Sequence, residues 1–132
     1  KLDNVRIIRF DAVEVLQEMI LDNSIAGFHI FFPDPWQKKK HNKRRLVKKE
    51  FIELMQRKLV PGGYIYVVTD WTPYAEWILE EFEKVDGLVN YASNGYCDPV
   101  SWRPITKFEQ KGIAENHTIY EIWIEKTIKI RK

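Results

Sequence analysis

Strand-like and helix-like segments alternate along this chain, and the alternation restricts the fold more than any other feature of the sequence. Runs rich in β-branched and aromatic residues predict strands at residues 5–10, 25–32, 64–69 and 118–126. Strands separated by helices favour an α/β fold with a mostly parallel sheet. The last strand breaks the alternation, so we expect it to be an antiparallel strand at the C-terminal edge of the sheet.

Three segments between these strands have apolar residues at helical spacing. The first begins at Asp11, the second follows the cationic residues 38–45, and the third begins near Thr72, which we expect to cap a helix with Pro73 at its first position. Their apolar faces consist of Val13, Leu16 and Ile20; of Val47, Phe51, Leu54, Met55 and Leu59; and of Tyr74, Ile78 and Phe82. Residues 61–63 predict a turn, and residues 86–105 predict a long loop that holds a short strand.

The length of 132 residues and the 45% share of apolar residues fit one globular domain that spans residues 1–132. The chain opens at Lys1 directly before a predicted strand, so we expect this domain to be truncated at its N-terminus. The single cysteine, Cys97, excludes an intrachain disulfide and suits a reducing cytoplasm, where we expect the protein to be located. The three histidines are too scattered along the sequence to suggest a metal site.

Three of the predicted strands lead into an aspartate, namely Asp11, Asp34 and Asp70. In open α/β sheets, ligands bind at the carboxyl ends of the strands. A single aspartate at such a place is as readily a helix cap or a turn former. Three of them at neighbouring strand ends indicate a binding site with a shared acidic rim.

The segment after the second predicted strand combines a stiff turn with a cluster of cations. Pro33 and Pro35 restrict the backbone on both sides of Asp34, and Trp36 offers a flat ring to a nucleic-acid base. Six cations follow within residues 38–45. Because they would oppose the dipole of a helix that begins there unless an anion binds, they favour nucleic-acid binding over the alternative of a merely solvated helix start.

Four stretches of the chain resemble the tRNA (guanine-N7)-methyltransferases of the TrmB type. The most specific are Pro33-Asp34-Pro35-Trp36 with the following Lys38, His41 and Lys43-Arg44-Arg45, and Arg103-Pro104-Ile105 with the following Thr106-Lys107-Phe108-Glu109. The others are Phe10-Asp11-Ala12 and the stretch from Pro61-Gly62-Gly63 to Thr69-Asp70. The resemblance covers nearly the whole chain. It implies part of a class I, Rossmann-like fold that uses S-adenosylmethionine as methyl donor.

The resemblance also implies roles for individual residues. Asp34 matches the active-site position, and Asp11 and Asp34 match positions that contact the cofactor. Substrate-binding positions are matched by Lys38, Asp70, Thr106, Lys107, Phe108 and Glu109, and RNA-binding positions by Lys40, His41, Asn42, Lys43, Arg44 and Arg45. Thr106 and Glu109 also have the spacing of a helix capping box, and we expect both roles.

The implied reaction is methyl transfer to N7 of a guanine in the variable loop of tRNA. N7 carries a lone pair at neutral pH, so the reaction needs positioning rather than a general base. We expect Asp34 to accept hydrogen bonds from guanine N1–H and N2–H₂. The main departure of the chain from the family is that no glycine-rich turn precedes residue 5, and a minor one is Asn116 where glycine is expected. We therefore expect the first two βα units to be missing and the 132 residues to be inactive by themselves.

Two other functions fit part of the sequence. A non-catalytic RNA-binding module would use the cations and aromatic residues but would leave the three aspartates unexplained. A class I methyltransferase with a protein or small-molecule substrate would use the aspartates but not the cationic residues. Salt-dependent tRNA binding and methyl transfer together distinguish the three. The sequence leaves open whether the protein is a monomer or a homodimer.

Overall fold

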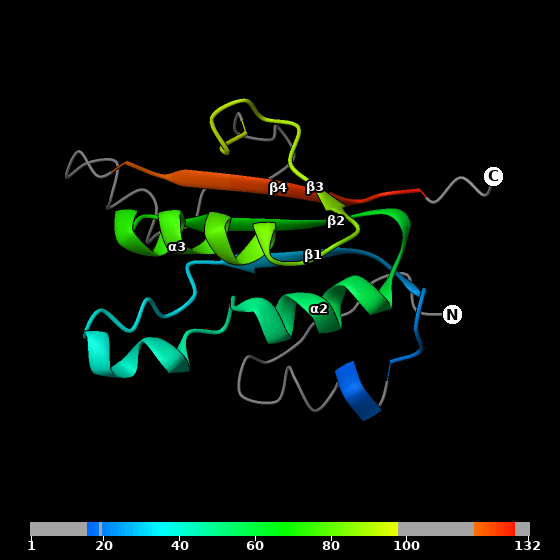
Figure 1. The fold of residues 1–132 in the computed structure, drawn as a ribbon, viewed down its shortest axis with the longest axis horizontal. Helices are drawn as coiled ribbons and strands as arrows, with labels where there is room; N and C mark the ends of the chain where they lie inside the picture. Colours follow the sequence, from blue (N-terminus) through cyan, green and yellow to red (C-terminus); the bar gives the residue numbers. More distant parts are fainter. Residues whose placement is uncertain (1–15, 19, 98–117, 129–132) are drawn as a thin grey trace.

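A computed structural model describes residues 16–18, 20–97 and 118–128, and four strands in these ranges form one sheet (Figure 1). The strands are β1 (Ile25–Phe31), β2 (Leu59–Thr69), β3 (Leu88–Val89) and β4 (Tyr120–Lys126), in the order β1-β2-β4-β3. β1 and β2 are parallel, whereas β4 is antiparallel to both β2 and β3. The strand and helix start predicted at residues 5–15 lie outside the described residues.

Helices α2 (Lys49–Lys58) and α3 (Thr72–Glu83) lie side by side and pack against one face of the sheet (Figure 1). Helix α2 connects β1 to β2, as a parallel pair requires. The arrangement confirms the predicted α/β class. No helix in the described part of the chain is long and apolar enough to cross a membrane.

The two faces of the sheet differ in chemistry, because side chains alternate along each strand. Paired positions across the three longer strands place Phe28, Ile65 and Ile124 on the helix side, all buried in the core. The neighbouring row, His29, Tyr66 and Trp123, lies on the opposite face. There the Tyr64 ring stacks on Trp123 at 4.2 Å between centroids, and its hydroxyl lies 2.7 Å from His29 Nε2.

The boundaries of β2 differ from the sequence prediction, which placed a turn at residues 61–63 and began the strand at Tyr64. The strand begins at Leu59 and continues through the Pro-Gly-Gly segment. Ile25 pairs with Leu59 and Gly27 pairs with Tyr64, so two steps along β1 match five along β2 and the extra residues form a bulge. Gly62 has a φ of +84°, which explains the glycine at this position.

The predicted C-terminal strand is antiparallel, as expected, but it is not at the edge of the sheet. The two-residue strand β3 pairs with its outer side, and this is the short strand predicted within residues 86–105. Among the described strand pairs, one is parallel and two are antiparallel. The parallel pairing is therefore confined to β1 and β2 in this part of the chain.

Helices α2 and α3 begin one or more residues away from the predicted starts. Residues 39–44 form a separate 3-10 helix, η1 (Lys39–Arg44), and α2 begins only at Lys49, so the cations do not lie at its N-terminus. In α3, Trp71 occupies the N-cap and Thr72 is the first helical residue. The Thr72 hydroxyl lies 2.7 Å from the Tyr120 hydroxyl, which gives it a partner on β4 in place of the helix backbone.

The N-terminus of α2 is capped by a side chain from the neighbouring helix. Glu81 of α3 is only 5% exposed, and its Oε1 accepts a hydrogen bond of 2.8 Å from the backbone N–H of Lys49. Its other oxygen is paired with Lys84. A carboxylate at a helix N-terminus satisfies a free N–H group and interacts favourably with the helix dipole. Glu81 therefore joins the two helices.

We predict that Glu81→Ala lowers the free energy of unfolding by about 1–3 kcal/mol, because it removes the cap and leaves a partly buried N–H without a partner. Chemical denaturation of the two proteins measures the difference. Glu80→Ala on the exposed side of the same helix is the matched control and should stay within about 0.5 kcal/mol of the parent. Equal losses in the two variants would contradict a capping role for Glu81.

Candidate functional site

A cavity of about 600 Å³ lies at the carboxyl ends of β1 and β2. Because the two strands are parallel, the segments that leave them meet at the same edge of the sheet. Phe32, Pro33 and Pro35 line the cavity after β1, and Asp70 and Trp71 line it after β2. Gln37, Thr72, Pro73 and Thr118 complete the lining. The cavity has mainly apolar and aromatic walls with one carboxylate.

The segment that leaves β1 has an unusual backbone. Phe32 and Trp36 have φ values of 51° and 43°, in the left-handed region that bulky residues rarely adopt. The two residues flank Pro33–Pro35, so the turn is defined at both ends. Asp34 lies at its tip, exposed, and its Oδ1 accepts a 3.0 Å hydrogen bond from the backbone N–H of Trp36. Asp34 is not among the residues that line the cavity, whereas Asp70 is.

Arg45 holds this turn from inside the protein. The side chain is 5% exposed, and its Nε donates a 2.7 Å hydrogen bond to the carbonyl oxygen of Pro35. Its guanidinium lies over the rings of Tyr74 and Trp77, 5.1 and 5.0 Å from their centroids. Burial lowers the pKa of Arg45. The prediction that Arg45 binds RNA directly does not fit this position, because packing on α3 and the bond to Pro35 keep the guanidinium away from solvent.

Tyr74 is a second buried residue that contacts the segment between η1 and α2. Its hydroxyl oxygen accepts a 3.1 Å hydrogen bond from the backbone N–H of Val47. Burial raises the pKa of Tyr74 to about 12, so the phenol remains neutral at physiological pH. Helix α3 thus contacts the chain on both sides of Leu46 through Arg45 and Val47.

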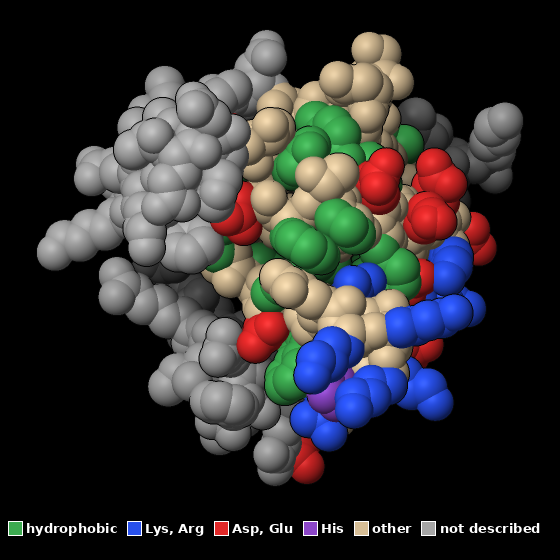
Figure 2. All heavy atoms as spheres, turned by 90° about the vertical axis from the view of Figure 1, so that its left-hand side faces the viewer, with side chains coloured by type: hydrophobic (Ala, Val, Ile, Leu, Met, Phe, Trp, Pro, Cys, Tyr) green, Lys and Arg blue, Asp and Glu red, His purple; other side chains and the backbone are tan. Residues whose placement is uncertain are grey.

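The other cations of residues 38–45 are on the surface. Lys38, Lys39, Lys40, Lys43 and Arg44 are all exposed. Figure 2 shows Lys and Arg side chains gathered on one side of the molecular face that contains the strand ends. The Arg44 guanidinium lies over the Trp36 ring at 5.2 Å, and His41 meets the same ring edge-on at 5.9 Å. Trp36 is therefore already covered in part by two residues of the predicted RNA-binding set.

Asn42 has a role within η1 that the sequence did not indicate. Its side-chain amide lies 3.0 and 3.1 Å from the carbonyl oxygens of Trp36 and Lys38, which requires the amide nitrogen to face them as donor. Asn42 thus closes the turn that presents the neighbouring lysines. Asp11 and Thr106, Lys107, Phe108 and Glu109, the remaining predicted site residues, lie outside the described residues.

Sequence reasoning missed several residues of the cavity. Trp71 follows directly after Asp70, and its indole Nε1 is buried without a hydrogen-bond partner in the described part of the chain. Thr72 and Thr118 enter the lining because the start of β4 lies beside the end of β2. Pairing of β4 with β2 could not be read from the sequence, although the position of Trp71 and Thr72 after a predicted strand was a usable signal. No group of three or more possible metal ligands occurs among the described residues.

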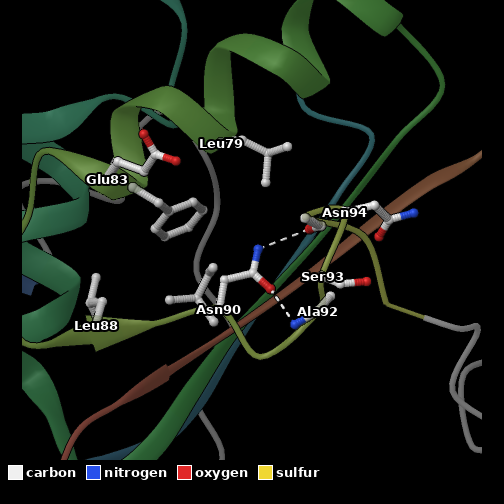
Figure 3. Close-up of a pocket in the computed structure, with 10 residues that line it drawn as sticks. Leu79, Glu83, Leu88, Asn90, Ala92, Ser93 and Asn94 are labelled. Atoms are coloured by element: carbon white, nitrogen blue, oxygen red, sulfur yellow. Dashed lines mark hydrogen bonds between the residues drawn. The ribbon is translucent and has the colours of Figure 1, made fainter.

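A second cavity, of about 370 Å³, lies between α3 and the loop after β3 (Figure 3). Asn90 organises that loop, since its amide donates to the carbonyl oxygen of Gly95 at 2.9 Å and accepts from the Ala92 N–H at 3.0 Å. Leu79 packs against Gly95, where a Cβ atom would lie 2.7 Å from the leucine. Both polar ends of the Asn90 side chain are therefore used to hold the loop.

We predict that Arg45→Lys lowers the free energy of unfolding by about 1–3 kcal/mol, because an ammonium group cannot both stack on two rings and reach the Pro35 carbonyl. Thermal or chemical denaturation measures the loss. Arg44→Lys, which keeps the charge at an exposed position, should leave stability unchanged. If the two variants behave alike, Arg45 does not support the turn.

Comparison with known proteins agrees with this architecture. A family model described as "Putative methyltransferase" matches residues 1–122. A tRNA (guanine-N(7)-)-methyltransferase of Aromatoleum aromaticum is 46% identical over 121 residues, which are 92% of this chain and 46% of the relative. One of Methylobacillus flagellatus is 49% identical over 122 residues, 92% of this chain and 51% of the relative. The chain thus spans about half the length of these curated relatives.

Solved structures agree on the fold. A protein of Thermus thermophilus, described as "Putative DNA Modification Methylase", superposes with a TM-score of 0.55 at 20% sequence identity over 92% of this chain and 54% of that one. At this identity the likeness concerns the fold alone. The sheet is part of a class I, Rossmann-like methyltransferase fold, and the chain belongs to the methyltransferase family whose model spans residues 1–122.

Proposed function

We propose that the complete protein transfers the methyl group of S-adenosylmethionine to N7 of a guanine in the variable loop of tRNA. The observation that carries the proposal is the cavity at the carboxyl ends of β1 and β2, which adjoins the exposed cations of residues 38–44. The names of the relatives support the same reaction. In this proposal the cavity binds the guanine base, and the cations bind the phosphate backbone of the tRNA.

The cavity has the properties of a site for a flat heterocycle. Its volume of about 600 Å³ is within the usual range for small ligands, and Pro33, Pro35 and Trp71 provide apolar surface. Asp70 supplies a carboxylate among these walls. A carboxylate accepts two parallel hydrogen bonds, and guanine offers N1–H and N2–H₂ as neighbouring donors. This match favours guanine over adenine, which lacks that pair of donors.

S-adenosylmethionine, when bound, supplies an electrophilic methyl group. The residues of this chain then have three tasks: to orient the base, to exclude water and to favour the positive charge that the guanine acquires. Asp34 and Asp70 are the carboxylates near the strand ends that can meet the last requirement. In this proposal Asp34 contributes to the cofactor site together with Asp11, which lies outside the described residues, and no glycine-rich turn precedes residue 5.

The exposed cations account for tRNA affinity. Lys38, Lys39, Lys40, Lys43 and Arg44 form no ion pair with any described residue, so their charge is available to phosphates. Phosphate contacts give affinity that falls steeply with salt. Because only residues 36–38 separate the Pro33–Pro35 turn from η1, phosphates bound to the cations would lie close to a base in the cavity.

We predict that Asp34→Asn lowers kcat/KM for methyl transfer to tRNA at least ~10²-fold in the complete protein, as removal of one preorganised charge does elsewhere. Asparagine keeps an Oδ1 that can accept the Trp36 N–H, so the variant removes the charge and preserves the turn. The dissociation constant for tRNA should change little, because phosphate contacts dominate it. Labelled S-adenosylmethionine and a filter-binding titration give the two quantities.

Asp34→Ala is the companion variant, since it removes the turn hydrogen bond as well as the charge. If Asp34→Asn turns over normally while Asp34→Ala is unstable, Asp34 only forms the turn and Asp70 becomes the candidate carboxylate. A complete protein that binds tRNA with steep salt dependence but transfers no methyl group would favour a non-catalytic RNA-binding module. Methyl transfer to other substrates with no tRNA affinity would favour the remaining alternative.

A further inference from the structure

We propose that a third cavity, formed by the cationic segment and α2, binds the phosphate backbone of the tRNA at a distance from the base site. This inference rests on the proposed function and extends it. The cavity has a volume of about 540 Å³, and its rim carries Lys43, Arg44, Lys48 and Arg57. We call these four residues the α2 rim.

The α2 rim is built from two elements. Lys43 and Arg44 come from η1, Lys48 precedes α2, and Arg57 lies in the last turn of α2. Positions 50, 54 and 57 recur at intervals of four and three residues, so they share one face of the helix. Arg57 lies nine positions after Lys48, which corresponds to about 13 Å along a helix. A nucleic-acid strand carries one charge per roughly 3.4 Å, so several consecutive phosphates can lie along the rim.

The floor of the cavity differs from its rim. Phe51 and Leu54 line the cavity but are only 5% and 3% exposed. They contribute to the hydrophobic core and leave little apolar surface for a ligand. The charged groups that the cavity presents are mainly those of the cationic rim, and they favour an extended anion as the ligand.

The charges of the rim are not neutralised within the described structure. None of its four residues forms an ion pair with a described carboxylate, and the one acid in the lining is Glu50. Arg57 is close enough to Asp22 to lower the pKa of that carboxyl group, but the main cause is Lys58, which contacts Asp22 at 2.8 Å. Lys48 donates one hydrogen bond to the carbonyl oxygen of Lys43, at 2.9 Å, and an ammonium group has two further donors.

Two observations favour RNA over another polyanion. The α2 rim shares Lys43 and Arg44 with the exposed cations beside the base site, so one backbone can follow both surfaces without a break. Arg44 also lies over the Trp36 ring, which places an aromatic face at the point where the two surfaces meet. Stacking of bases on aromatic rings next to phosphate-binding cations is typical of RNA recognition.

The test is tRNA binding by the complete protein at a series of salt concentrations. The double variant Lys48→Gln with Arg57→Gln removes two charges and keeps side chains that can donate hydrogen bonds. We predict that the slope of log Kobs against log salt falls by about 2, one unit for each lost phosphate contact. The melting temperature should not change. Lys49→Gln, on the same helix but outside the cavity lining, is the matched control and should leave the slope nearly unchanged.

A third variant, Lys39→Ala with Lys40→Ala, separates this proposal from the proposed function. If that variant weakens tRNA binding and the rim variant does not, the α2 rim is not a phosphate site while the proposed function stands. If neither variant changes tRNA binding, both proposals fail. An effect of Lys49→Gln equal to half that of the double variant would show a general charge effect and would overturn a specific site at the rim. Stronger binding of the rim to an acidic peptide than to tRNA would also overturn it.

Discussion

Parallel pairing of β1 with β2 is the constraint on which the rest of the structure depends. It places the exits of the two strands at one edge of the sheet, where residues from both exits, Phe32, Pro33 and Pro35 and Asp70 to Pro73, line the same cavity. Parallel strands need a crossover, and here α2 is that crossover. The same connection also carries η1, so the cations lie close to the cavity at the strand ends. Antiparallel pairing would have put the two exits at opposite edges.

Contacts with helix α3 fix the conformation of the chain between β1 and α2. Glu81 caps α2, Tyr74 accepts the Val47 N–H, and the rings of Tyr74 and Trp77 support Arg45. Three separate points of the β1–α2 connection are thus fixed to one helix. Without these contacts, repulsion among the six cations of residues 38–45 would disfavour a single conformation of this segment. Because α3 begins two residues after Asp70, the helix that fixes the cationic segment also fixes the acidic side of the cavity.

The sequence predicted the main elements well, but not how individual polar residues are used. A short apolar run identified β1, and periodicity identified α3 and β4 because each of these two has one apolar face. Asp70 was expected at the carboxyl edge of the sheet, where it lines a cavity. The start of β2 was missed because Pro-Gly-Gly is a turn signal that here belongs to a bulge, which depends on pairing with β1. Arg45 was predicted to bind RNA together with its neighbours, because the sequence shows the charge of this residue. The sequence does not show that the Arg45 side chain packs on two aromatic rings of α3.

The division of residues 38–45 into inward and outward cations has a physical reason. A guanidinium is planar and more weakly hydrated than an ammonium group, so it can be buried against aromatic rings at a lower cost while keeping its charge. The one buried cation of the segment is an arginine, and the four lysines are exposed. The buried charge has no carboxylate partner among the described contacts of Arg45 and is held by a carbonyl oxygen and two rings. Such an arrangement leaves the local charge positive overall beside the cavity at the strand ends, which is the property that the proposed phosphate contacts require.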